Sequence, residues 1–490
     1  MTRALAVLGT ASDVGKSVVT VALCRLLADA GLDVAPFKAQ NMANQAGVTA
    51  DGLEMPRAQI VQARAARQTP HVDMGPILLK PVTQTGAQVV VLGKALGIVD
   101  AAKYWADTSE LATIAHAALH RLADRHAVIV LEGAGSPVEL NLLERDFVNL
   151  RAARAVDARV IIVADIDRGG IFAQVKGTLD LLPAEDRRSV LGVVVNRFRG
   201  DPTLFEDGVA QLEALTGVAV LGVVPYLAHG LDEEDRPLPV AVDQPAPPGR
   251  LRVGAILSPR VSNTEDLAPL LAEPDVHLTW ITDPRLASEQ DLLILPGSKA
   301  TVADLVHHTA TGVAQVIGDA ARDGAWVLGL CGGYQMLGEE LEDKARSEGG
   351  PERWRGLGLL PVRTIFEPTK LARESTCHSL WPVAGRRLTG YEIHHGRSEA
   401  TNDVLPLVIE GGAAIGCRRG RAVGCYLHGL LADDEWRAAF LNVVREDRSR
   451  PRQPVQRAEP LDVRIDRWAQ HVRRSLRRDA WPRILRAATA

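Results

Sequence analysis

Residues 4–30, ALAVLGTASDVGKSVVTVALCRLLADA, decide the fold of the N-terminal half of the chain. Residues 4–8 are an apolar run typical of a buried strand, and residues 18–30 have the apolar spacing of a helix. Residues 9–17 join them in a glycine-containing turn. A turn that leads from a strand into a helix directs backbone N–H groups at phosphate oxygens, and the helix dipole favours negative charge there. This stretch therefore predicts a nucleotide-binding loop.

The loop supplies side chains for binding ATP and its metal ion. In this geometry Lys16 would reach the β and γ phosphates, and the Ser17 hydroxyl would ligate Mg²⁺. Thr10 stands where the strict GxxxxGK[ST] pattern has its first glycine, but the succession of strand, turn and helix is kept. Thr10, Asp13 and Gly15 are the other candidates for contacts to the nucleotide.

Short β-rich runs alternate with helix-length segments through residues 1–225. This alternation predicts a parallel sheet covered by helices on both faces. The run at residues 128–131 ends in Glu132, at the edge of the sheet where the loop lies, and a carboxylate there is suited to bind Mg²⁺. Asp165 ends another strand in the same way, and it is either a second functional carboxylate or a helix cap.

The same pattern divides the chain into segments. We expect a P-loop domain at residues 1–230, a linker at 231–250, a second α/β domain at 251–445 and a basic helical tail at 446–490. Prolines and the acidic run 232–235 mark the linker, and this run indicates solvated chain in preference to a metal site. Apolar residues recur at helical spacing in the tail, which predicts a helix packed on the second domain in preference to a partner-binding arm.

The composition excludes several classes of protein. The 490 residues carry 56 basic and 60 acidic side chains, a formal net charge of −4, so no overall field attracts nucleic acid or an anionic membrane. No apolar run reaches the roughly 20 residues that a membrane-spanning helix needs. We therefore expect a cytoplasmic protein with no nucleic-acid or membrane partner, and the sequence leaves its oligomeric state open.

A second reactive centre is expected at Cys331. None of the five cysteines belongs to a CxxC pair, which argues against a disulfide framework or a structural zinc site. Residues 327–330 form a strand-like run that leads into Cys331 and Gly332, a turn that would project a nucleophile into a cleft. Backbone N–H groups near Gly332, and near Gly297 in a second strand-end turn, would hold an oxyanion. His428, at the end of a later strand-like run, is the candidate base.

These residues and others resemble the glutamine-dependent cobyric acid synthases of the cobalamin pathway. The P-loop and the cysteine turn alone would indicate only an ATP-dependent amidotransferase, and further motifs narrow the resemblance. The matching segments, spread over almost the whole chain, are PFKAQNM (36–42), LLKP (78–81), DIDRGG (165–170), VNRFRGD (195–201), LPGSK (295–299), CGGYQ (331–335), GYEIH (390–394) and YLHG (426–429).

The resemblance implies a first domain similar to dethiobiotin synthetase and a second domain similar to class I glutamine amidotransferases. Dethiobiotin synthetases share the Gly-Thr start of the loop at Thr10. By the same likeness, Lys38 contacts the transferring phosphoryl group and Asn196 reads the adenine edge. Glu132 falls where a carboxylate binds Mg²⁺, and Asp51 is a further candidate for a metal carboxylate. ATP and Mg²⁺ are therefore the implied cofactors.

The family's reaction is the amidation of the b, d, e and g carboxylates of adenosylcobyrinic acid a,c-diamide, each step consuming ATP and L-glutamine. It implies phosphorylation of the carboxylate in the first domain and release of ammonia from glutamine by Cys331 and His428. Class I triads usually place a glutamate two residues after the histidine, but Leu430 stands there. The group that orients His428 is therefore open, and Glu392 is a candidate.

Three alternatives compete with this interpretation. Cobyrinic acid a,c-diamide synthase joins the same two kinds of domain, but the FKAQN string at residues 37–41 favours the cobyric interpretation. Lipid-linked peptidoglycan amidotransferases divide the two domains between two chains, whereas here they are fused. A P-loop switch protein of the chromosome-partitioning type, with a silent cysteine domain, would carry a second lysine early in the loop, and residues 10–13 contain none.

Overall fold

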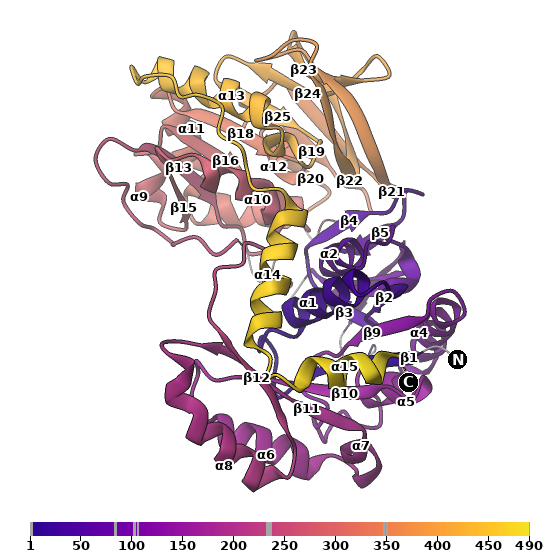
Figure 1. Ribbon diagram of the computed structural model, residues 1–490. Helices are drawn as coiled ribbons and strands as arrows, with labels where there is room; N and C mark the ends of the chain where they lie inside the picture. The colour runs from indigo at the N-terminus through magenta and orange to yellow at the C-terminus, as the bar shows by residue number, and fades with distance from the viewer. Residues whose placement is uncertain are drawn as a thin grey trace.

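The computed structural model describes residues 3–82, 86–100, 104, 107–231, 238–345, 348 and 351–489. The N-terminal half forms the lower of two α/β domains in Figure 1, and the C-terminal half forms the upper one. The last two helices, drawn in yellow, run from the upper domain onto the lower one. Within the described residues, no helix has the length and apolar character needed to cross a membrane.

The first domain is built on a sheet of six parallel strands in the order β12-β11-β10-β1-β9-β2. Apolar clusters cover both faces, so the strands are apolar along most of their length and the predicted parallel sheet is confirmed. The strands are β1 (Arg3–Gly9), β2 (Val34–Phe37), β9 (Val128–Glu132), β10 (Arg159–Asp165), β11 (Val190–Phe198) and β12 (Val220–Pro225). The helices are α1 (Lys16–Asp29), α2 (Arg57–Ala65), α4 (Ser109–Ala123), α5 (Leu150–Ala155), α6 (Ile171–Leu181), α7 (Ala184–Ser189) and α8 (Glu206–Thr216).

A smaller β-structure extends the first domain towards the second. Its four-stranded sheet has the order β3-β6-β7-β8, and a hairpin of β4 and β5 lies beside it. A small apolar cluster joins Ala46 and Leu78 of this structure to Ile393 of the second domain, so the two domains share a packed contact. The strands are β3 (Gln40–Met42), β4 (Ala46–Val48), β5 (Glu54–Pro56), β6 (Ile77–Pro81), β7 (Gly86–Val91) and β8 (Lys94–Asp100).

The second domain is organised around an 11-stranded mixed sheet. The strands β15, β13, β16, β18 and β25 lie side by side and parallel. From β24 onward the neighbouring strands pair antiparallel, except that β19 runs parallel to β21. The strands are β13 (Leu251–Ile256), β15 (Val276–Ile281), β16 (Leu292–Leu295), β18 (Trp326–Leu330), β19 (Glu340–Glu342), β20 (Arg353–Arg355), β21 (Val362–Ser379), β22 (Arg387–Ala400), β23 (Leu405–Glu410), β24 (Ala413–Arg419) and β25 (Ala422–Cys425). The helices are α9 (Pro284–Ala287), α10 (Thr301–Ala310), α11 (Val313–Arg322), α12 (Gly332–Met336) and α13 (Asp434–Asp447).

The linker follows the edge of the second domain. The backbone N–H of Trp280 in β15 donates to Ala241 O (2.9 Å), and the N–H of Asp243 donates to Trp280 O (2.8 Å). The indole of Trp280 also donates to Leu238 O (2.9 Å). The linker from residue 238 onward is therefore fixed to β15, whereas the acidic run 232–235 lies outside the described residues.

The C-terminal tail packs on the first domain, so the prediction that it packs on the second domain is wrong. Its helices are α14 (Leu461–Ser475) and α15 (Ala480–Thr489), and their apolar faces join the cluster under α1 and β1. Trp468 is only 2% exposed, and its indole donates to Val18 O (2.7 Å). Helical spacing identifies an apolar face but does not specify which surface covers it.

Replacement of Trp468 by alanine is expected to lower the free energy of unfolding of the first domain by about 3–5 kcal/mol, because it leaves a large cavity. Urea unfolding followed by circular dichroism checks this. Val463→Ala is the matched control, since Val463 lies on the same helix and is 47% exposed. A loss for Trp468→Ala no larger than the loss for the control would contradict the packing described here.

Candidate active sites

The loop before α1 has the strained backbone of a phosphate-binding turn. Asp13 and Gly15 both adopt positive φ angles, 59° and 95°. A β-carbon on Gly15 would lie 2.1 Å from Nδ2 of Asn196, so only glycine fits there. The loop curls around Lys16, whose buried ammonium group donates to Ala11 O (2.9 Å) and Gly135 O (3.1 Å). The predicted loop residues are therefore held together at the start of α1.

Glu132 is the centre of a buried polar network at the end of β9. One carboxylate oxygen, Oε1, accepts from Ser17 Oγ (2.6 Å) and Lys38 Nζ (3.1 Å), and Oε2 accepts from Gln62 Nε2 (2.5 Å). Burial alone would raise the pKa of Glu132, but the Lys38 charge and the hydrogen bonds from Ser17 and Gln62 outweigh burial and lower it. The carboxylate is therefore held ionised beside Lys38.

The same network fits a Mg²⁺ ion. Ser17 and Glu132 present oxygen atoms 2.6 Å apart, and hydroxyl and carboxylate oxygens are the ligands that Mg²⁺ prefers. No group of three or more His, Cys, Asp or Glu side chains suited to a metal occurs among the residues that the structure describes. Two protein ligands completed by water and phosphate oxygens are typical of Mg²⁺ bound with a nucleotide.

Three other predicted residues of the first domain, Asn196, Asp13 and Asp165, lie near the phosphate loop or at the ends of neighbouring strands. Asn196, at the end of β11, is buried against the loop and donates to Val14 O (2.9 Å). Asp13 pairs with Arg197 (3.2 Å), and the carboxylate of Asp165 caps the turn after β10 by accepting from the Asp167 N–H (2.8 Å). Asp13 and Asn196 line a large cavity at the contact between the domains, and Lys16 and Glu132 line the same cavity.

The structure does not bring Asp51 to this network. It is exposed in the turn between β4 and β5, where it accepts a hydrogen bond from Thr49 Oγ1 (2.5 Å). The residues that line the large cavity do not include Asp51. The prediction of Asp51 as a metal ligand therefore has no support in the structure, and Gln62, which no motif marks, contacts Glu132 instead.

Cys331 lies on a sharp turn between β18 and α12. Its φ is +50° and its ψ is −108°, a backbone conformation that costs energy and that clusters at functional sites. A β-carbon on Gly333 would lie 1.9 Å from Leu295 O, and one on Gly332 would lie 2.8 Å from the backbone N of Ser298. The glycines therefore let the turn approach Leu295 of β16 and Ser298, which follows Gly297.

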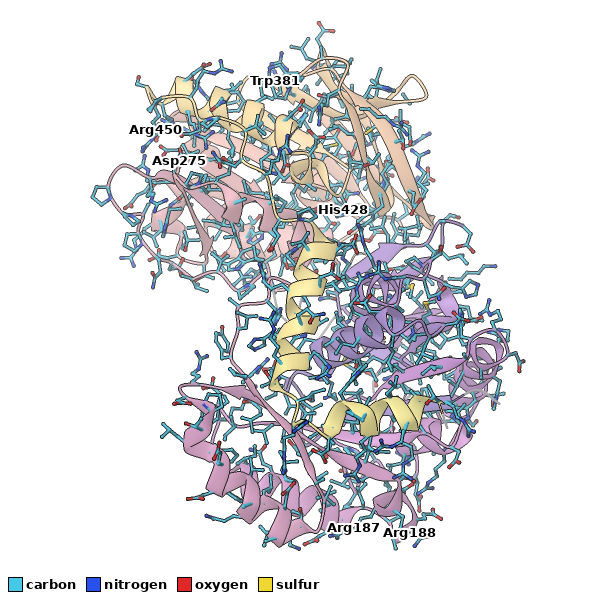
Figure 2. The ribbon with its side chains drawn as sticks, viewed as in Figure 1. Arg187, Arg188, Asp275, Trp381, His428 and Arg450 are labelled. Atoms are coloured by element: carbon cyan, nitrogen blue, oxygen red, sulfur yellow. The ribbon has the colours of Figure 1, made fainter. Side chains whose placement is uncertain are left out.

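His428 lies at the edge of the second domain that faces the first domain (Figure 2). Its Nδ1 atom is 2.7 Å from Oδ2 of Asp266, and its ring stacks on Tyr391 with the ring centroids 4.8 Å apart. Burial lowers the pKa of His428, but the negative charges of Asp266 and the Cys331 thiolate outweigh burial and raise it well above its ordinary value. A protonated imidazole beside the Cys331 sulfur is therefore favoured.

The prediction that Glu392 orients His428 is wrong, because Asp266 occupies that position. Glu392 accepts hydrogen bonds from Arg373 (2.7 Å) and Ser375 (2.7 Å) instead. Asp266 lies in the short helix Thr264–Ala272, far from His428 in the sequence, and its other oxygen accepts from the Gly429 N–H (2.7 Å). The sequence offers no motif that would have paired these two residues.

A cavity of about 1800 Å³ extends from the phosphate loop to residues that contact His428, whereas Cys331 lines a separate pocket. On one side it is lined by the phosphate loop, Lys38 and Glu132. On the other side it is lined by Asp266 and Tyr391, which contact His428. The linker and the start of α14 complete its wall. The cavity thus offers room for a large ligand beside the phosphate loop, at the contact between the two domains.

Both halves of the chain match known families. Residues 5–238 match the CobQ/CobB/MinD/ParA nucleotide binding domain, and residues 252–436 match the CobB/CobQ-like glutamine amidotransferase domain. The chain is 46% identical to the cobyric acid synthase of Chlorobaculum tepidum, over 96% of each chain. It is 44% identical to that of Sorangium cellulosum, over 97% of each, and 43% identical to that of Chloroflexus aurantiacus, over 98% of this chain and 99% of the relative. These similarities extend over both domains.

Proposed function

The chain belongs to the cobyric acid synthase family and is a glutamine-dependent ligase, and we propose that it amidates the b, d, e and g carboxylates of adenosylcobyrinic acid a,c-diamide. The nucleotide-binding domain supports the use of ATP. The observation that carries the proposal is the large cavity, because the phosphate loop, Lys38 and Glu132 line one side of it, and Asp266 and Tyr391, which contact His428, line the other. A corrinoid held there would present its carboxylates to Lys38 and Glu132.

The first centre is suited to phosphoryl transfer. A carboxylate is a poor electrophile, so its oxygen first attacks the γ phosphorus of ATP to give an acyl phosphate and ADP. Lys16 and Lys38 offset the negative charge that develops on the transferring group. Ser17 and Glu132 would hold Mg²⁺, which supplies further positive charge to the phosphates. Ammonia then attacks the acyl carbon, and phosphate leaves as the amide forms.

The second centre is suited to releasing ammonia from glutamine. The Cys331 thiolate attacks the side-chain amide carbon, and backbone N–H groups near Gly297 and Gly332 stabilise the oxyanion. His428 gives its proton to the departing nitrogen, and Asp266 holds the imidazole in the required orientation. Water then cleaves the thioester to give glutamate. The ammonia crosses to the acyl phosphate through the space between the domains.

The closest alternative is cobyrinic acid a,c-diamide synthase, which would use the same two centres on a less amidated corrinoid. Incubation of the full chain with ATP, Mg²⁺ and glutamine, together with one corrinoid at a time, separates the two. We expect adenosylcobyrinic acid a,c-diamide to gain four amides, as followed by mass spectrometry. Conversion of unamidated cobyrinic acid alone would move the assignment to the a,c-diamide synthase.

Asp266→Asn is expected to lower the glutamine-dependent rate by roughly 10²- to 10⁴-fold, because the imidazole loses the group that orients it. The substitution also removes a negative charge that raises the pKa of His428. The protonated form of His428 is present below this pKa and is lost as the pH rises through it. Since this proton goes to the departing nitrogen, the alkaline limb of glutamine-dependent kcat/KM should move to lower pH.

Glu392→Gln is the matched control for this pH profile. Glu392 lies near the cysteine centre but contacts Arg373 and Ser375. The alkaline limb of glutamine-dependent kcat/KM should therefore stay in place in the Glu392→Gln variant. Ammonia-dependent amidation by Asp266→Asn should match that of the unaltered protein, since the phosphoryl centre is intact. An alkaline limb that moves with Glu392→Gln and stays fixed with Asp266→Asn would contradict the assigned role of Asp266.

A further inference from the structure

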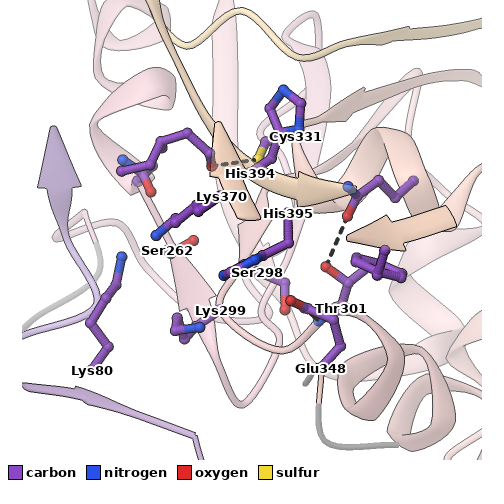
Figure 3. A pocket seen from close by; sticks show the side chains of 14 residues that line it. Lys80, Ser262, Ser298, Lys299, Thr301, Cys331, Glu348, Lys370, His394 and His395 are labelled. Carbon is purple, nitrogen blue, oxygen red and sulfur yellow. Dashed lines mark hydrogen bonds between the residues drawn. The ribbon is translucent and has the colours of Figure 1, made fainter. Parts of the chain in front are cut away.

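A charged pocket beside Cys331 contains groups that the two centres leave unexplained. Three lysines line it: Lys299 follows the Gly297 segment, Lys370 belongs to β21, and Lys80 comes from β6 of the first domain. Figure 3 shows Lys80 entering from the first domain, on the side of the pocket opposite Cys331. Glu348 contributes a carboxylate to the same pocket. The pocket is therefore assembled from both domains.

Lys299 is the most unusual of these groups. Its side chain is 6% exposed, and among the described residues its ammonium group makes no hydrogen bond or close ion pair, although the charge of Glu348 acts on it. Burial lowers the pKa of Lys299; the charge of Glu348 opposes this shift, and the charge of Lys370 adds to it. A buried ammonium group that makes no hydrogen bond is costly to fold. Its place in a pocket that reaches Cys331 therefore points to an anionic ligand group.

The surrounding charges increase this preference for an anion. Glu54 of the first domain is buried and accepts from both Lys80 Nζ (2.8 Å) and Lys370 Nζ (2.7 Å). One carboxylate thus balances two ammonium groups, and a net positive charge remains across the domain contact. Burial lowers the pKa of Lys80 to about 8, the direction expected for an ammonium group that lacks sufficient negative charge.

Glu348 supplies a single opposite charge at the same pocket. Its carboxylate is buried and accepts from the backbone N–H of Thr301 (2.9 Å). Burial raises the pKa of Glu348, and the charge of Lys299 opposes that rise. A pocket with both a cationic side and one carboxylate is complementary to the zwitterion of a free α-amino acid, provided that its side chain reaches Cys331.

We propose that Lys299 binds the α-carboxylate of glutamine and that Glu348 binds its α-ammonium group, while Lys80 of the ATP-binding domain and Lys370 supply surrounding positive charge. This inference rests on the proposed release of ammonia by Cys331. It makes glutamine binding depend on the contact between the domains, because Lys80 and Glu54 belong to the first domain. The neutral side-chain amide is left free to face the thiolate.

The test compares two amide substrates in the full chain. Glutamine carries the α-carboxylate, whereas 4-aminobutanamide has the amide and the amine but no carboxylate. Lys299→Met should lower kcat/KM for ammonia release from glutamine by roughly 10- to 100-fold, mainly through KM, since a charged hydrogen bond is lost. The same variant should change kcat/KM for 4-aminobutanamide by less than about threefold. Lys94→Met, at an exposed lysine of β8, is the matched control and should change neither.

Equal losses on both substrates, or an unchanged kcat/KM for glutamine, would overturn the assignment of Lys299. Thermal unfolding and ammonia-dependent amidation show whether the variant is folded. If Lys299→Met does not fold, Lys299→Gln is measured in the same way, because it removes the charge and keeps a donor of similar length. Ammonia release does not require a corrinoid, so a protein that hydrolyses glutamine but amidates no corrinoid would contradict the proposed function and leave this test valid.

Discussion

Replacement of Cys331 by alanine should abolish amidation from glutamine while leaving amidation from added ammonia intact. In the proposed mechanism the Cys331 thiolate forms the covalent bond to the glutamine amide, and loss of a nucleophile costs on the order of 10³-fold or more in rate. In the proposed mechanism acyl phosphate formation uses Lys16, Lys38 and Glu132 of the other domain, which the substitution does not touch. Initial rates of corrinoid amidation, measured with glutamine and then with ammonium chloride, check both halves of this expectation.

Cys377→Ala is the matched control. Cys377 is buried in β21 of the same domain, and burial raises the pKa of its thiol to about 12, so it is not a nucleophile near neutral pH. The Cys377→Ala variant should therefore amidate the corrinoid at unchanged rates with glutamine and with ammonia. If Cys331→Ala lost amidation from ammonia as well, the proposed separation between the two centres would be wrong.

Replacement of Lys16 by alanine should abolish amidation from either nitrogen source. Lys16 is the cation that the phosphate loop encloses, and without it the charge on the transferring phosphoryl group is not offset. We expect a fall on the order of 10³-fold in the rate of ADP formation that depends on the corrinoid. Cys331 and its contacts are unaltered, so the variant should still hydrolyse glutamine.

Lys176→Ala, at a partly exposed lysine on α6, serves as the control for Lys16→Ala. Among the described residues Lys176 pairs with Asp180 on the same helix, so corrinoid amidation and glutamine hydrolysis should both keep their rates. A substantial ammonia-dependent rate in Lys16→Ala would mean that phosphoryl transfer is organised by other residues.

The parts of the candidate sites that the sequence predicts are those built from neighbours in the chain. The phosphate loop and the Cys331 turn each join a strand to a helix within a few residues. Their sequence motifs are therefore sufficient to predict the local backbone geometry. Glu132 could be placed because parallel strands end at a common edge of the sheet. The structure brings Ser17, Lys38 and Glu132 into one network, as that reasoning requires.

The parts that escape prediction depend on packing between distant segments. Asp266 reaches His428 only because the short helix Thr264–Ala272 lies against the segment after β25. The tail helices cover the first domain although they follow the second in the sequence, since an apolar face does not identify its partner. Lys299 stands in a predicted motif, but the charges of Lys80, Lys370 and Glu348 around it are visible only in the structure.

The most direct test of the central claim is a mass-spectrometric time course with glutamine labelled with ¹⁵N in its amide. The full chain is incubated with adenosylcobyrinic acid a,c-diamide, ATP and Mg²⁺ in the presence of excess unlabelled ammonium, and each component is omitted in turn. We expect stepwise formation of the four-amide product, dependent on ATP, with ¹⁵N in most of the new amides. Four unlabelled amides would contradict internal transfer of ammonia, and no amidation of this corrinoid would contradict the proposed function itself.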